Sequence, residues 1–217
     1  MQFNYNGHRV RESQPVREIR KLRKVITIDS RDRDPVKFVK VNGGKASSDP
    51  GDYVVYLPRV YETVTSIRLM SAEIRAPETD GFAAEDTYIF LSLEGLNKMD
   101  ETAEGASRSG QVDSIFAKIP LTTNGSAGIA AGSPVFYSDR VSMENVTVYS
   151  PPIGRLDRLH ATFRRHKPLS SITTISPANA PIIFGTSENS LTFEIEYLDN
   201  GFNQVSSFET MLDAHHN

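Results

Sequence analysis

Two segments in the last third of the chain alternate apolar and polar residues over the length of a strand. In residues 157–164 the apolar side holds Leu159, Ala161 and Phe163, and in residues 191–197 it holds Leu191, Phe193, Ile195 and Tyr197. Successive side chains of a strand point to opposite faces, so a period of two requires one dry face and one solvated face. Because this pattern is typical of antiparallel sheets, we expect both segments to cover one core in a β-sandwich.

Further strands are expected along the whole chain. A bend at residues 59–61 should separate two of them, and the turn residues of 151–154 should mark the entry to the strand at 157–164. No segment predicts a helix longer than a turn or two, although residues 202–217 have a rough three-to-four spacing. The expected total of about eight to nine strands favours an all-β antiparallel sandwich, and we predict a single jelly roll. The additional strands are expected at residues 25–28, 52–58, 63–74, 87–94, 112–119, 134–137 and 145–149.

Length and composition favour one domain with flexible ends. The 217 residues are 38% hydrophobic, which is enough for one large β core. The chain has no cysteine, and its first thirty residues contain no apolar run of signal-peptide length, so we expect neither disulfides nor secretion. We predict an extended basic arm at 1–24, the sandwich at 25–200, and a tail or short helix at 201–217.

The predicted arm is basic and the remainder of the chain is acidic. Seven cations against two acids give the arm a net charge of +5, so the rest has −8 within a total of −3. This asymmetry favours contact with an acidic neighbouring subunit over a solvated tail, an anionic membrane surface or nucleic acid. Nucleic acid is the weakest of these alternatives, because no aromatic residue interleaves with the cations to stack on bases. The predicted partner-binding residues are Arg9, Arg11, Arg17, Arg20, Lys21, Arg23 and Lys24.

Asp29, Asp32 and Asp34 lie close together before a proline, and their three carboxylates are candidate ligands for a calcium ion. Arg31 and Arg33 stand between them and supply cations within the same loop, while the glycine and distal glutamate of a calcium loop are missing. We therefore expect local ion pairs and Asp turns here rather than a metal.

No pattern in the sequence predicts a catalytic or cofactor site. The glycine-rich stretch 42–51 lacks the spacing and the preceding strand of a phosphate loop, and the stretch 122–133 precedes a proline and a strand in place of a helix. Glu194 and Glu196 lie two apart on the solvated side of their strand, whereas the carboxylates of a glycosidase usually face each other across a cleft. We predict no enzyme, no cofactor, no metal and no small-molecule substrate. The five histidines also lack metal-ligand spacing: His8, His160, His166, His215 and His216.

Two blocks of the sequence resemble a known family. The first comprises residues 28–34 (IDSRDRD), 52–58 (DYVVYLP) and 64–74 (VTSIRLMSAEI); the second runs from 152–159 (PIGRLDRL) to 189–199 (NSLTFEIEYLD). Together they resemble the beginning and end of minor capsid proteins of large icosahedral nucleocytoplasmic DNA viruses, including those of algae. The pattern departs after Ile74, where Arg75 and Ala76 precede Pro77 in place of an immediate proline.

The resemblance implies a structural virion protein with a jelly-roll core. Such a protein, assembled in the host cytoplasm, would cross-link or support major capsid subunits, contact other minor capsid proteins, and could lie on an inner membrane surface. The arm would bind a neighbour through many weak charge pairs and through strand addition. The alternative function is a jelly-roll vertex or fibre module that binds a receptor or glycan, and a carbohydrate-active enzyme comes third.

Overall fold

The structure is a computed structural model that describes residues 20–33, 40–42, 45–47, 49–100, 114–121, 128–139, 145–165 and 181–199. The chain divides into two units: Arg23–Tyr197 is one, and Met1–Leu22 with Leu198–Asn217 is the other. The site and the core described below belong to the first unit. Residues 1–19 of the predicted arm and the predicted tail at 201–217 lie outside the described residues.

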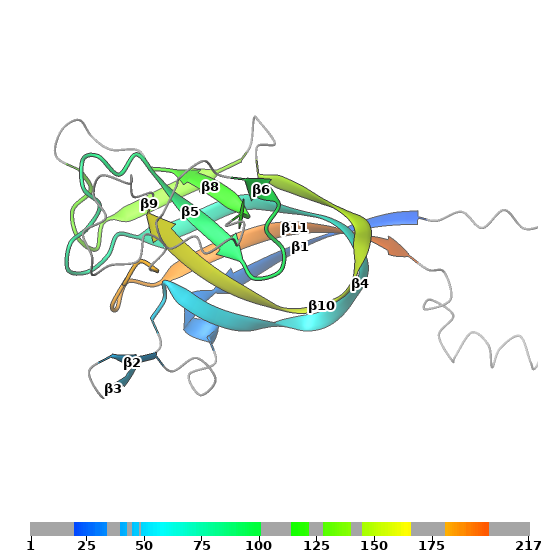
Figure 1. The fold of residues 1–217 in the computed structure, drawn as a ribbon, viewed down its shortest axis with the longest axis horizontal. Coiled ribbons are helices and arrows are strands. Elements are labelled where there is room, and N and C mark those ends of the chain that lie inside the picture. The colour runs from blue at the N-terminus through cyan, green and yellow to red at the C-terminus, as the bar shows by residue number, and fades with distance from the viewer. Residues whose placement is uncertain are drawn as a thin grey trace, which may run out of the picture. The chain divides into compact units, whose positions relative to one another are not determined.

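The described part of the chain is built from antiparallel strands, and its only helix is a single turn, η1. Seven strands form one sheet in the order β1-β11-β4-β10-β5-β8, with β9 paired to β4, and the sheet curls into a half-barrel (Figure 1). The predicted all-β, sandwich-like class is confirmed, while the jelly roll stays a prediction. The elements are β1 Arg20–Asp29, η1 Ser30–Asp32, β2 Lys40–Asn42, β3 Lys45–Ser47, β4 Asp52–Arg75, β5 Tyr88–Leu93, β6 Met99–Asp100, β7 Ser114–Ile115, β8 Ala117–Pro120, β9 Pro134–Ser138, β10 Val146–Arg165 and β11 Asn189–Asp199.

Two predicted breaks between strands are wrong, because one continuous strand runs through each of them. β4 continues for 24 residues through the expected bend at 59–61, and β10 continues for 20 residues through the expected turn at 151–154. These strands pair with each other from Val146 opposite Arg68 to Thr162 opposite Asp52. Register shifts between Val148 and Ile153 and between Leu156 and Arg158 leave room for the prolines, because a bulge tolerates a residue without a backbone N–H.

The inward faces of the two alternating segments are confirmed. Leu159 is 1% exposed and Phe163 is fully buried. On β11, Phe193 and its two apolar neighbours at 191 and 195 are also fully buried. Phe163 packs edge to face on Phe184, with 5.5 Å between ring centroids, and Phe193 packs in the same way on Phe116 at 5.9 Å. These aromatic pairs lie in one continuous core.

The predicted solvent exposure of one face of β10 is wrong at Arg164. It was expected to be solvated, yet only 6% of the residue is exposed. Its guanidinium lies 5.0 Å from the ring centroid of Phe90 on β5. A guanidinium is weakly hydrated and stacks on aromatic rings, so this position buries an arginine where sequence alternation alone indicated water.

β1 begins inside the stretch that was expected to be an arm. It starts at Arg20, and its buried residues are Ile26 and Ile28, whereas Val25 and Thr27 are exposed. Four of the seven predicted partner-binding cations therefore lie in a strand: Arg20, Lys21, Arg23 and Lys24.

Candidate functional site

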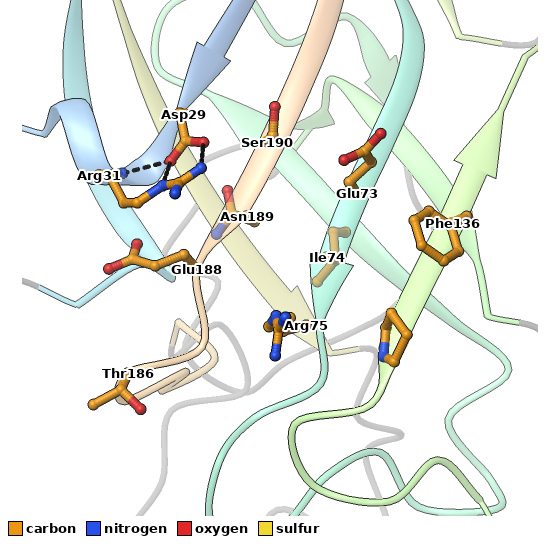
Figure 2. A pocket seen from close by; sticks show the side chains of 11 residues that line it. Asp29, Arg31, Glu73, Ile74, Arg75, Phe136, Thr186, Glu188, Asn189 and Ser190 are labelled. Carbon is orange, nitrogen blue, oxygen red and sulfur yellow. Dashed lines mark hydrogen bonds and ion pairs between the residues drawn. The ribbon is translucent and has the colours of Figure 1, made fainter.

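A pocket of about 410 Å³ opens on the outer face of the sheet, where β1, β11, β4 and β9 lie side by side (Figure 2). Its position follows from the strand register. Ser190 of β11 lies opposite Glu73 of β4, which in turn lies opposite Phe136 of β9. These three side chains form one row across the sheet. The described residues that line it are Asp29, Arg31, Glu73, Ile74, Arg75, Pro134, Phe136, Thr186, Glu188, Asn189 and Ser190.

One wall of the pocket is closed by an ion pair between Asp29 and Arg31. The guanidinium of Arg31 donates from Nε to Oδ1 at 2.9 Å and from its terminal nitrogen to Oδ2 at 2.6 Å, and the Arg31 backbone N–H also donates to Oδ1 at 2.9 Å. These hydrogen bonds stabilise the carboxylate, so the pKa of Asp29 is lowered from its ordinary value. The predicted local ion pair and Asp turn are confirmed. Asp34 lies outside the described residues.

A second network holds Glu188, the residue immediately before β11. Arg33 donates to both carboxylate oxygens of Glu188, at 2.8 and 3.0 Å, and to the carbonyl of Ser30 at 2.6 Å. The buried Ser30 hydroxyl donates to Glu188 and accepts from the Asn189 backbone N–H at 2.9 Å. This network joins the end of β1 to the start of β11. Sequence reasoning missed it because Arg33 and Glu188 are 155 residues apart.

The remaining charged groups of the pocket have no partner within the described part of the chain. Glu73 and Arg75 are both exposed on β4 and form no ion pair or side-chain hydrogen bond with a described residue. Phe136 beside them is 70% exposed, more than any other large hydrophobic residue that the structure describes. Besides its paired groups, the pocket therefore presents the carboxylate of Glu73, the guanidinium of Arg75 and the ring of Phe136 to another molecule.

A separate polar cluster surrounds His160 of β10. Its Nε2 lies 2.6 Å from Oδ1 of Asp52 on β4, and its Nδ1 lies 2.7 Å from Oε2 of Glu94, which follows β5. The pKa of His160 is raised, chiefly by the hydrogen bond with Asp52 and further by Glu94, against the opposing effect of burial. The cluster ties three neighbouring strands together. Within the described residues, no group of three metal-ligating side chains is arranged to hold an ion.

The predicted partner-binding residues do not gather at one described site. Arg9, Arg11 and Arg17 lie outside the described residues. The Nε of Arg23 lies 2.8 Å from Oε1 of Glu196, so part of its charge is used within the chain. Glu196 also accepts from the Ser66 hydroxyl at 3.1 Å, an arrangement that suits a structural contact on the outer face.

The other histidines that were considered as ligands lie outside the described residues: His8, His166, His215 and His216. No helix in the described part of the chain is long and apolar enough to cross a membrane. No family model and no curated protein matches this sequence.

Proposed function

We propose that this chain is a structural virion protein, a minor capsid protein that binds major capsid subunits and other minor capsid proteins in an icosahedral shell. The sequence blocks that resemble such proteins support the proposal. The structural observation on which it depends is the outer face around Phe136, where a large apolar ring stands in water beside two charges without described partners.

The charged residues of this pocket differ in whether another described residue pairs with them. Asp29 is satisfied by Arg31, and Glu188 is satisfied by Arg33. By contrast, Glu73 and Arg75 are exposed and have no partner among the described residues, so their charges are available to a molecule that carries the opposite charges. An exposed aromatic ring flanked by charges that no described residue pairs has the composition of a protein–protein interface, in which an aromatic anchor is rimmed by polar groups.

Incorporation into particles tests the proposal. The tagged chain is expressed in infected host cells, and the particles are purified, cross-linked and examined by mass spectrometry. We expect cross-links from Lys21, Lys24 or Lys118 to the major capsid protein, and we expect a Phe136→Ser, Arg75→Glu double variant to be incorporated less. If the chain is absent from purified particles, the capsid function is wrong.

A second candidate is a vertex or fibre module that binds a receptor glycan. The same pocket favours it, because an open hollow of about 410 Å³ with a carboxylate, a guanidinium and an aromatic face can accept sugar hydroxyls and pack an apolar sugar face. Binding to a glycan array that is lost in Arg75→Ala and in Phe136→Ala would support this function. The capsid function instead predicts no glycan binding by the wild-type chain.

A further inference from the structure

The outer edge of β9 carries backbone groups that have no partner among the described residues. β9 pairs only with β4 among the described strands, from Pro134 opposite Arg75 to Ser138 opposite Ser71. On either side of this register, the N–H of Ala76 donates to the carbonyl of Ser133 at 2.9 Å, and the N–H of Asp139 donates to the carbonyl of Met70 at 2.8 Å. The odd-numbered residues from 133 to 139 therefore direct their backbone groups toward β4.

In an antiparallel pair, hydrogen-bonded and non-hydrogen-bonded residues alternate, so the even-numbered residues of β9 face the other way. The open edge presents the N–H and carbonyl groups of Phe136 and Ser138 and the carbonyl of Pro134. None of these groups has a hydrogen-bond partner in the described part of the chain. Such a row is a template for another strand.

A second hollow adjoins the first half of β9. It has a volume of about 410 Å³ and is lined by residues 133–136 and by the loop residues 128–130. It shares Pro134 and Phe136 with the pocket on the outer face. An added strand, which lies about 4.8 Å from its neighbour, would bring one of its own side chains beside the exposed ring of Phe136.

We propose that β9 pairs with β9 of a second copy of this chain across a two-fold axis at Phe136. In that register, the N–H of Phe136 donates to the Phe136 carbonyl of the second copy, and the reverse bond forms by symmetry. The N–H of Ser138 donates to the Pro134 carbonyl of the second copy, so the proline, which has no N–H, is needed only as an acceptor. The two Phe136 rings lie side by side, as aromatic cross-strand pairs do.

Charge distinguishes this edge from the other edges of the sheet. β1 carries the exposed cations Arg23 and Lys24, and β8 carries the exposed Lys118, whereas β9 consists of Pro-Val-Phe-Tyr-Ser and bears no charge. Charged side chains, lysine above all, blunt an edge against pairing with another chain. A two-fold axis brings the same residues of both copies together, so any charge on the strand would face a like charge. An uncharged strand with an aromatic residue at its centre avoids this repulsion. The inference holds whether or not the capsid function does.

Sedimentation equilibrium of the full chain tests the pairing. We expect a concentration-dependent dimer of the wild-type protein. Phe136→Lys and Ser138→Pro should each raise the dimer dissociation constant by about tenfold or more, the first by adding like charges at the axis and the second by removing an N–H that β4 does not use. Ile183→Lys is the matched control, because Ile183 is 68% exposed and lies outside β9.

A single-cysteine probe gives a second measurement, since the chain has no cysteine of its own. Paired Phe136 residues would have Cα atoms about 5.5 Å apart, a separation that a disulfide spans. Phe136→Cys should form a covalent dimer under mild oxidation, and Ile183→Cys should remain monomeric. A wild-type chain that is monomeric at every concentration overturns the proposal, and so does a dimer that survives Phe136→Lys or is weakened equally by Ile183→Lys.

Discussion

His160 and Asp52 lie on adjacent strands with Nε2 2.6 Å from Oδ1, and the other ring nitrogen of His160 faces Glu94 at 2.7 Å. A carboxylate only accepts hydrogen bonds, so the imidazole must be protonated on both nitrogens to satisfy both neighbours. The cluster is therefore an imidazolium bridge between β4, β10 and the end of β5. Its stabilising effect depends on a proton.

The direction of the pH dependence follows from the raised pKa of His160. A group whose folded-state pKa lies above its unfolded value of 6.5 contributes fully below that value, and the contribution is lost as pH rises through the folded pKa. We expect His160→Gln to lower the free energy of unfolding by about 1–3 kcal/mol near pH 5.5 and by less near pH 8.5. Urea melts at both pH values measure the difference. Arg158→Gln on the exposed side of β10 is the control, and a loss for His160→Gln that is equal at the two pH values would contradict the bridge.

The two buried aromatic residues of the alternating segments should be large contributors to stability. Phe163 and Phe193 are fully buried in one core, and truncation of either ring removes apolar contacts and leaves a cavity. We expect Phe163→Ala and Phe193→Ala each to cost about 3–5 kcal/mol of unfolding free energy, measured by denaturant melts. Val148→Ala, at a side chain that is 68% exposed, should cost well under 1 kcal/mol. A cost of less than about 1 kcal/mol for either phenylalanine would mean that the ring does not pack in the core.

The parts of the fold that sequence predicted are those set by local alternation. Leu159 and Phe163 alternate with polar residues, so their inward direction could be read directly, and the Asp29–Arg31 pair was visible because the two residues are two apart. Phe136 gave no such signal. It lies in an apolar run with Val135 and Tyr137 on either side, so alternation could not show that its ring faces water.

The parts that sequence did not predict depend on contacts between distant residues. Proline and glycine indicated breaks in β4 and β10, but pairing along the two strands outweighs local turn preference. His160 meets Asp52, 108 residues away, only because the strand register places them together. Glu73 and Arg75, which pair with no residue in the described ranges, could not be recognised either, since the sequence does not show which charges find partners.

Asp139 should be more sensitive to substitution than Glu196, whose side chain is 18% exposed and pairs with an exposed arginine. Its side chain is fully buried, and Oδ2 accepts from Nε of Arg68 at 3.0 Å, where the arginine side chain is itself only 14% exposed. Asp139→Ala leaves a largely buried guanidinium without its counter-charge, so we expect a loss of about 3–5 kcal/mol. Glu196→Ala breaks an ion pair with an exposed arginine and a hydrogen bond from the Ser66 hydroxyl, so it should cost less, about 1–2 kcal/mol. Denaturant melts compare the two, and equal losses would show that the Arg68–Asp139 pair is solvated.

Two glycines should respond in opposite ways to the addition of one methyl group. A Cβ on Gly51 would lie 1.8 Å from the carbonyl oxygen of Ile182, which is backbone and cannot rotate away, and the Gly51 carbonyl accepts from the Phe163 N–H at 2.8 Å. A Cβ on Gly154 of β10 would meet nothing within 4 Å. We expect Gly51→Ala to cost about 1–3 kcal/mol, because the contact between the loop before β4 and the segment at 182 must open. Gly154→Ala should be neutral or stabilising by up to about 1 kcal/mol, since it reduces the freedom of the unfolded chain. Thermal and urea melts measure the stability of the two variants. If Gly51→Ala is as stable as Gly154→Ala, the start of β4 and residue 182 are not in contact in solution.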